Sequence, residues 1–472
     1  MKKLAFLALI CLLTACSSGN ATKTSESSLA ASESAETSFN AESTPASSAS
    51  DESAASTQSS EDASTAETDA EITSSPTTNA ELYALFVQEW KKGDVTSLYA
   101  YSSDILKSMF DEEAFQFMFC GNFPVFGKIK GIENEQVLGK ENNGSYCGTL
   151  VYENAKADFQ LALDHLQISG FYYDLRIEKP FDVTLDNGVT EHYFPLQSGD
   201  FTLNAAYVKA EKENAPTALL IPGSGPSDYN ETIGILPTFQ DLARELARKG
   251  VSSLRIEKRT FHFASECKNT DTLEEEYFTD LNSAITWLEN ENPSSELWYL
   301  GHSLGVNIAA ELIHRHPAKG LILWNGTARH LADVAADQYA EQAPAFASTY
   351  RGMAENAAAV TEETAKGTNF FSCPDYYWAS YNKLTTLKSI RDAHVPTLIL
   401  NSLLDRQIFE VDRKLWQESF GKDDFVKIRV FEDQSHAGYK LDAKTANYYQ
   451  LAVFPEELTD EIADFIFLPP KD

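Results

Sequence analysis

The sequence has few basic residues for its size. Its 472 residues include 38 lysines and arginines against 70 aspartates and glutamates, which gives a formal net charge of -32. Nucleic acids and anionic bilayers attract clustered basic side chains, so this balance argues against both as partners. The chain also lacks a C-x-x-C pair and a His-rich cluster. A zinc site is therefore not expected, nor is any other metal or cofactor.

The apolar run at the N-terminus is short. Leu4–Leu13 follows two lysines and precedes Thr14-Ala15-Cys16. A basic start, a short apolar stretch and small residues predict a secretory signal at 1–15, because the run is too short to span a bilayer. Leu13–Cys16 also resembles the lipobox of bacterial lipoproteins. This resemblance implies lipidation of Cys16 and an extracytoplasmic protein anchored to the cell membrane; an ordinary cleaved signal is the alternative.

Residues 16–79 are poor in apolar side chains. Ser, Thr, Ala, Glu and Asp dominate, and Phe39 is the only aromatic residue. Such a segment buries too little apolar surface to offset its ordering entropy, so we expect a disordered tether. Aromatic and aliphatic residues return near residue 80 and continue to the end, which leaves room for two domains.

The first of these, residues 80–178, is predicted to be a small α+β domain. Helical apolar spacing, as in Leu82, Phe86 and Trp90, is followed by strand-like alternation after residue 145. The segment resembles the cystatin-like or NTF2-like domain that precedes hydrolases in some bacterial lipoproteins. No catalytic constellation is visible in it, so we expect a binding or spacing role.

The second domain, residues 181–472, alternates buried strands with helices. Continuous apolar runs at 218–221, 321–324 and 397–400 are separated by helical patterns. This alternation predicts an α/β fold with a mostly parallel sheet, whose active residues lie at the carboxyl ends of the strands. The helical stretch at about 326–395 contains no core strand and is predicted to be an inserted cap.

The pentapeptide Gly301-His302-Ser303-Leu304-Gly305 lies between a predicted strand at 297–300 and a predicted helix. A G-x-S-x-G in that context is typical of a nucleophile elbow, which presents a serine hydroxyl above a sheet. Ser303 is therefore the candidate nucleophile. His302 is expected to pack or to line the pocket.

The remaining catalytic residues follow in the chain order nucleophile, acid, base, which resembles the α/β-hydrolase family. Asp405 follows the strand after the cap, and His436 follows the next strand. A serine hydroxyl needs an imidazole to accept its proton, and a carboxylate to orient that imidazole. Asp423 and Asp424 are competing acids, but they precede the final strand and fit a solvated turn better.

Backbone amides are expected to stabilise the oxyanion. One is that of Leu304; the other belongs to Ser224 or Gly225, between which the sequence does not decide. The segment 223–234 and the tripeptide Lys258-Arg259-Thr260 resemble bacterial serine-aminopeptidase-like (S33-type) esterases. Tyr229 and Asn401 depart from that pattern, which more often has arginine and glycine there. Lys258 and Arg259 fit a structural ion pair better than a substrate-carboxylate site.

Four cysteines remain after the signal and the lipidation site. The pairs Cys120–Cys147 and Cys267–Cys373 are the favoured disulfides, since export permits oxidation, and buried thiols are the alternative.

The sequence thus predicts a serine hydrolase that cleaves small-molecule acyl esters through an acyl-Ser303 intermediate. An S33-like peptidase or an acyl thioesterase is the enzymatic alternative. A non-catalytic binding lipoprotein is the alternative of another class. The sequence leaves the oligomeric state open.

Overall fold

The computed structural model describes residues 74–185, 188–264, 266–267, 272–440 and 448–468. The predicted signal peptide, Cys16 and most of the predicted tether lie outside the described residues. None of the helices in the described ranges combines the length and the apolar character needed to cross a membrane.

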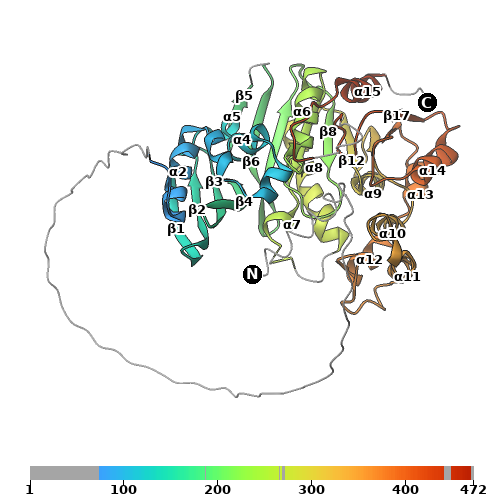
Figure 1. The fold of residues 1–472 in the computed structure, drawn as a ribbon. Coiled ribbons are helices and arrows are strands. Elements are labelled where there is room, and N and C mark those ends of the chain that lie inside the picture. Colours follow the sequence, from blue (N-terminus) through green and yellow to red (C-terminus); the bar gives the residue numbers. More distant parts are fainter. Residues whose placement is uncertain (1–73, 186–187, 265, 268–271, 441–447, 469–472) are drawn as a thin grey trace, which may run out of the picture. The chain divides into compact units, whose positions relative to one another are not determined.

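The first folded segment places helices on one face of an antiparallel sheet of order β1-β2-β3-β4 (Figure 1). Helix α2 begins where Thr78 accepts a hydrogen bond from the Glu81 amide and ends at Gly93 with a positive φ. Strand β3 alternates buried and half-buried residues, as a sheet covered on one face requires. The elements are α2 (Asn79–Lys92), η1 (Thr96–Tyr101), α3 (Asp104–Met109), α4 (Glu112–Cys120), α5 (Phe123–Phe126), β1 (Gly131–Lys140), β2 (Asn143–Val151), β3 (Ala155–Asp164) and β4 (Gln167–Ile177).

The second segment forms a nine-stranded sheet of order β17-β16-β13-β12-β8-β11-β7-β6-β5. The six strands from β17 to β11 are parallel, and β7, β6 and β5 continue the sheet in antiparallel fashion. The strands are β5 (Phe181–Thr184), β6 (Thr190–Ser198), β7 (Phe201–Lys209), β8 (Thr217–Ile221), β11 (Ser252–Ile256), β12 (Leu297–His302), β13 (Gly320–Trp324), β16 (Thr397–Ser402) and β17 (Val426–Phe431).

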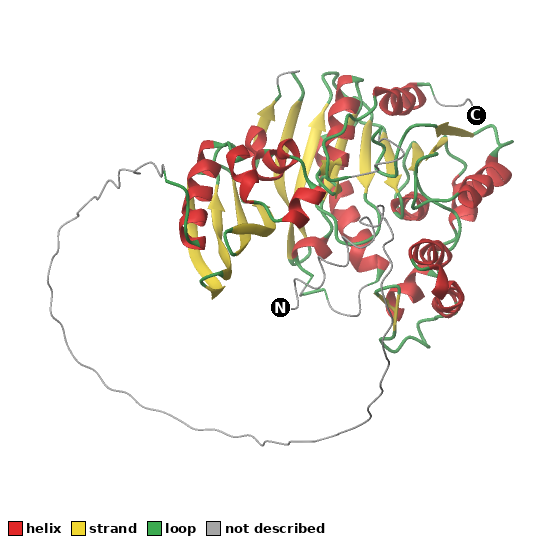
Figure 2. Ribbon diagram, viewed as in Figure 1, coloured by secondary structure: helices red, strands yellow, loops and turns green. Residues whose placement is uncertain are grey.

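Helices cover both faces of this sheet (Figure 2). In β8, Leu219 and Ile221 pack with α8 and α9, whereas Ala218 and Leu220 pack with α6 and α15. Because both faces are buried, the strand reads as an uninterrupted apolar run. The predicted α/β-hydrolase fold is confirmed. The helices flanking the strands are α6 (Thr238–Arg248), α7 (Arg259–His262), η2 (Glu274–Phe278), α8 (Thr279–Glu291), α9 (Gly305–Arg315), α14 (Glu410–Phe420) and α15 (Glu456–Phe467).

A mainly helical insertion connects β13 to β16. Its last helix, α13, lies against α9, where Asn307 donates a 2.8 Å hydrogen bond to the Thr386 hydroxyl. That helix therefore packs with the body of the sheet domain. The insertion contains α10 (Leu331–Gln342), η3 (Pro344–Phe346), α11 (Ala347–Ala358), the short hairpin β14 (Asn369–Phe370) and β15 (Cys373–Pro374), α12 (Asp375–Tyr381) and α13 (Thr386–Ala393).

The two segments share one hydrophobic core. Phe126 of α5 lies 5.7 Å from the Tyr193 ring of β6, measured between centroids. Tyr229, after β8, and Ala437, after β17, belong to the same buried cluster as the helices of the first segment. The small α+β segment thus packs against two loops that follow strands of the large sheet.

The structure has neither predicted disulfide, because Cys120, Cys147 and Cys373 are thiols in it. Cys120 ends α4 in the core between helices and sheet, with the buried Tyr146 on β2 facing the same core. Successive strand residues point to opposite faces, so Cys147 points away from Cys120. The favoured pairing of Cys120 with Cys147 and of Cys267 with Cys373 is corrected to the thiol alternative.

Candidate active site

Ser303 occupies a tight turn between β12 and α9. Its φ is +55°, a left-handed conformation that is unfavourable for residues other than glycine. A Cβ added to Gly301 would lie 2.2 Å from the Gly305 carbonyl oxygen, and one added to Gly305 would lie 2.2 Å from that of Ile221. Only glycine fits at these two positions. This strained strand-turn-helix is the geometry of a nucleophile elbow.

The candidate acid and base are in direct contact. Nδ1 of His436 lies 2.7 Å from Oδ2 of Asp405, and both side chains are buried. Oδ1 of Asp405 accepts hydrogen bonds from the amides of Gln407 and Ile408, at 2.7 and 2.9 Å, which fixes the carboxylate plane. Because Asp405 engages Nδ1, the nitrogen left for a nucleophile is Nε2. Asp423 precedes β17 and so lies at the opposite edge of the sheet.

The loop that carries His436 is attached to the elbow through its backbone. The His436 carbonyl oxygen lies 2.8 Å from Nε2 of His302 and accepts a 2.8 Å hydrogen bond from Nδ2 of Asn325. The rings of His302 and His436 are 4.7 Å apart between centroids. Among the described residues, no hydrogen bond joins Ser303 to His436. Such contacts commonly tighten only when substrate binds.

The loop after β8 lies against the nucleophile. A Cβ on Gly223 would come within 2.9 Å of the Ser303 Cβ and 3.4 Å of its hydroxyl oxygen. The Gly223 amide is engaged, since it donates a 2.6 Å hydrogen bond to Oε1 of Glu231. Within the part of the chain that the structure describes, the amides of Ser224, Gly225 and Leu304 have no protein acceptor. These three, the predicted oxyanion donors, remain free to bind a substrate oxygen.

Glu231 and His302 form a buried charged pair that the sequence analysis missed. Oε1 of Glu231 lies 2.9 Å from Nδ1 of His302. The two ring nitrogens of His302 thus face a carboxyl oxygen of Glu231 and the His436 carbonyl oxygen, an arrangement that a doubly protonated ring satisfies with both of its N–H groups. Burial opposes the charged ring, but the charge and hydrogen bonds of these partners raise the pKa of His302. The sequence does contain both residues of this pair: a carboxylate lies eight residues after Gly223, and a histidine lies in the elbow. These two residues were the signal from which the pair could have been predicted.

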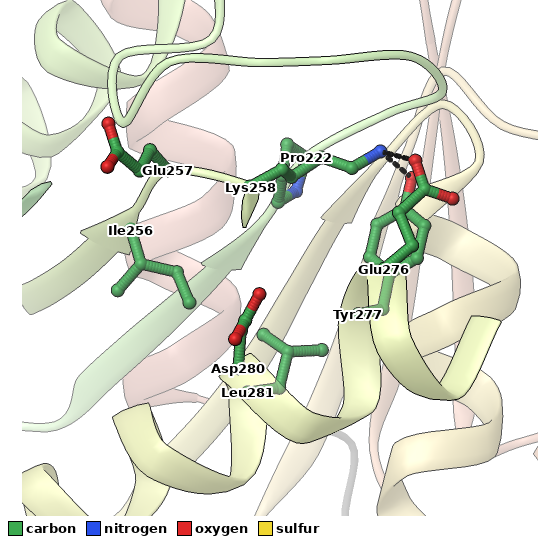
Figure 3. A pocket seen from close by; sticks show the side chains of 8 residues that line it. All are labelled: Pro222, Ile256, Glu257, Lys258, Glu276, Tyr277, Asp280 and Leu281. Atoms are coloured by element: carbon green, nitrogen blue, oxygen red, sulfur yellow. Dashed lines mark hydrogen bonds and ion pairs between the residues drawn. The ribbon is translucent and has the colours of Figure 1, made fainter. Parts of the chain in front are cut away.

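Lys258 is enclosed by protein groups (Figure 3). It forms an ion pair with Glu276, and its Nζ donates to the Tyr277 hydroxyl at 2.8 Å and to the Gly223 carbonyl at 3.1 Å. An ammonium has three protons, and all three are used. Burial lowers the pKa of Lys258, against the charge of Glu276, which raises it.

Arg259 is engaged in the same way. Its Nε and a terminal nitrogen contact the two carboxylate oxygens of Asp280 at 3.0 and 2.6 Å. The geometry of Lys258 and Arg259 therefore agrees with structural ion pairs and not with a substrate-carboxylate site. The described residues contain no group of three or more His, Cys, Asp or Glu side chains placed to hold a metal ion.

A mostly parallel sheet, an elbow on its central strand and a carboxylate-imidazole pair on later strands define an α/β hydrolase fold. Sequence comparison agrees with this class. Residues 230–365 match the family model described as serine aminopeptidase, S33. Esterase EstD of Thermotoga maritima is 29% identical over 335 residues, which cover 70% of this chain and 76% of that protein.

Several solved structures are similar to this chain. Est1E from Butyrivibrio proteoclasticus aligns with a TM-score of 0.40 and 13% identity, over 58% of this chain and 97% of that one. Esterase Pf2001 of Pyrococcus furiosus aligns with a TM-score of 0.38 and 14% identity, over 62% and 91%. A proline iminopeptidase of Mycobacterium smegmatis aligns with a TM-score of 0.39 and 15% identity, over 58% and 97%.

Proposed function

We propose that this protein is a serine hydrolase that cleaves carboxylic esters through an acyl-Ser303 intermediate. The observation that carries the proposal is the buried contact of 2.7 Å between His436 and Asp405. The backbone carbonyl of His436 lies at hydrogen-bond distance from His302, the residue that precedes a strained, positive-φ serine. This combination of nucleophile, base and orienting acid, in that chain order, is what acyl transfer requires.

In the proposed reaction, the Ser303 hydroxyl oxygen attacks the ester carbonyl carbon while Nε2 of His436 takes its proton. Asp405 stabilises the resulting imidazolium. The amide of Leu304 and that of Ser224 or Gly225 donate to the developing oxyanion. The intermediate collapses, the ester C–O bond breaks, and His436 returns its proton to the leaving alkoxide. Water, deprotonated by His436, then attacks the acyl-enzyme and releases the carboxylic acid and free Ser303.

The similarity to a named esterase supports esters as the substrate class. The match to an aminopeptidase model supports the peptidase alternative. A panel of p-nitrophenyl acyl esters, aminoacyl p-nitroanilides and acyl thioesters separates these, with Ser303→Ala measured alongside. We expect the highest kcat/KM for esters and at least a 10³-fold loss in the variant. Turnover that survives Ser303→Ala would contradict the nucleophile, and no turnover of any substrate would favour a binding lipoprotein.

We also propose that the protein is exported and anchored through a lipidated Cys16. The lipobox-like Leu13–Cys16 and the acidic, Ser-rich segment after it support this proposal. Fractionation of cells expressing wild type and Cys16→Ala tests it. Wild type should sediment with membranes and the variant should not. Equal distribution of the two proteins would contradict the anchor.

A further inference from the structure

The carbonyl of Gly223 accepts two hydrogen bonds from buried side chains. One comes from Nζ of Lys258 at 3.1 Å, and the other from the hydroxyl of Tyr277. Lys258 also donates to the Tyr277 hydroxyl oxygen, a contact that Figure 3 shows, so these two groups and the Gly223 carbonyl form a closed triangle. Lys258 and Tyr277 are 2% exposed, so water does not compete for these bonds.

The two partners of Lys258 are consecutive residues. Glu276 and Tyr277 lie on η2, a single π-helical turn before α8. Such turns interrupt an α-helix locally and occur frequently at functional sites. Here the turn brings the carboxylate and the phenol of neighbouring residues to the same ammonium group.

The geometry of the peptide bond transmits this contact to the oxyanion site. The Gly223 carbonyl and the Ser224 amide belong to one planar trans peptide, so they point in opposite directions. Holding the carbonyl toward Lys258 and Tyr277 therefore turns the Ser224 N–H away from them. The Gly223 amide is held separately by Glu231, so the peptides on both sides of Gly223 have fixed orientations.

The charge of Lys258 acts along the same bond. A cation on the carbonyl oxygen polarises the peptide and makes its N–H a stronger donor, as in any chain of coupled hydrogen bonds. The Tyr277 hydroxyl is strengthened as a donor because it accepts from the ammonium. A preorganised and polarised N–H stabilises an oxyanion more than a neutral carbonyl, so it lowers the barrier without tightening substrate binding.

We propose that Lys258 and Tyr277 are positioning residues of the oxyanion hole, which fix and polarise the Gly223–Ser224 peptide so that the Ser224 amide is the second donor. This inference rests on the proposed hydrolase function. It selects the Ser224 amide over that of Gly225 as the second donor, and it gives Lys258 a role in the reaction. Neither side chain touches the substrate.

The first test is Tyr277→Phe, which removes one donor to the Gly223 carbonyl and leaves the ion pair intact. Tyr299→Phe is a matched control, since Tyr299 is equally buried and donates at 2.8 Å to the carbonyl of His316, far from the elbow along β12. We expect Tyr277→Phe to lower kcat about 5- to 20-fold with KM within about 2-fold, a smaller loss than deletion of an oxyanion donor. The control should stay within about 2-fold.

A merely structural role of Tyr277 would not affect transition-state binding selectively. The inhibition constant of a trifluoromethyl ketone, which forms a tetrahedral oxyanion adduct with the serine, is therefore measured on the same variants. We expect it to rise by the factor by which kcat/KM falls. If Tyr277→Phe and Tyr299→Phe have equal kcat and equal inhibition constants, the inference is wrong.

The second test removes the charge. Lys258→Met alone would leave Glu276 buried and unpaired, so the double variant Lys258→Met/Glu276→Gln is used. Arg259→Met/Asp280→Asn removes the neighbouring buried ion pair as its control. We expect kcat to fall about 10- to 100-fold in Lys258→Met/Glu276→Gln and less than 3-fold in the control double variant. Equal losses of kcat in the two double variants would overturn the inference.

Ser303→Ala separates the proposed hydrolase function from the proposed positioning role. If it abolishes hydrolysis while Tyr277→Phe behaves as its control, only the positioning role fails. If Ser303→Ala retains hydrolysis, the proposed function fails and the inference with it.

Discussion

The carboxylate of Glu231 lies 2.9 Å from Nδ1 of His302, the residue before the candidate nucleophile. The same oxygen accepts the Gly223 amide at 2.6 Å. One buried carboxylate thus joins the oxyanion loop to the elbow, and His302 extends the connection to the His436 backbone. The pair of Glu231 and His302 thus connects the loops that follow β8, β12 and β17. We therefore expect the charge of Glu231 to affect catalysis, although this carboxylate contacts no reacting atom.

Glu231→Gln tests this. Glutamine keeps the shape, and its one oxygen can still face the Gly223 amide and His302, but the side chain loses the negative charge that strengthens both contacts. Its NH₂ group would occupy the place of Oε2, which is buried without a partner. We expect kcat to fall about 10- to 100-fold, the effect of losing one charge-assisted hydrogen bond, on the order of 1.5–3 kcal/mol. The measurement is ester hydrolysis together with a thermal melt that shows the variant folded. Glu135→Gln, an exposed carboxylate that accepts from Tyr83, should change kcat less than 2-fold.

Asp405→Asn should lower kcat about 10³- to 10⁴-fold. An asparagine oxygen can keep the bonds to the Gln407 and Ile408 amides, so the loop should keep its shape. The amide nitrogen would then face Nδ1 of His436 and force the tautomer that protonates Nε2, which cannot take the serine proton. Single-turnover and steady-state hydrolysis measure the loss. Asp423→Asn is the matched control and should match wild type; a larger loss there would reassign the acid.

Some of this site follows from sequence and some does not. The ends of parallel strands meet at one edge, so chain order alone predicts that Asp405 and His436 lie near Ser303. The structure places the first two 2.7 Å apart. Chain order does not say where a side chain points, so the pair of Glu231 and His302 was missed. The packing of Tyr229 on the first segment was missed for a similar reason, since it depends on contacts between distant parts of the chain.

The pairing of Cys120 with Cys147 was favoured because both lie in the small α+β segment, but the side chain of Cys147 points away from Cys120 in the structure. With Cys120, Cys147 and Cys373 as thiols, reductant should change the melting temperature by less than about 1 °C, whereas a bridge contributes about 2–4 kcal/mol. Burial raises the pKa of Cys120 to about 12, so its alkylation at pH 8 should be slow until the protein unfolds. Non-reducing peptide mapping tests directly whether the cysteines are bridged. A peptide that links Cys120 to Cys147 would contradict the structure at this site.

The junction between the small segment and the sheet should make stability depend on pH. Nδ1 of His262, on α7, lies 2.8 Å from Glu257, and its Nε2 forms an ion pair with Asp174 of β4. Burial disfavours the charged ring, but hydrogen bonds and charges of the two carboxylates outweigh it and raise the pKa of His262 to about 10.

Because the folded pKa exceeds the unfolded value, near 6.5, this stabilisation is complete below about pH 6.5 and is lost as the pH rises toward 10. Urea unfolding of wild type and His262→Gln at pH 6 and pH 10 measures it. The free-energy difference between the two proteins should be about 2–4 kcal/mol at pH 6 and should shrink at pH 10. His165→Gln replaces an exposed histidine of the small segment, away from the junction, and its pH dependence of stability should parallel that of wild type. A His262 difference that is independent of pH would mean that the ring is uncharged in the folded protein, and that packing alone holds the junction.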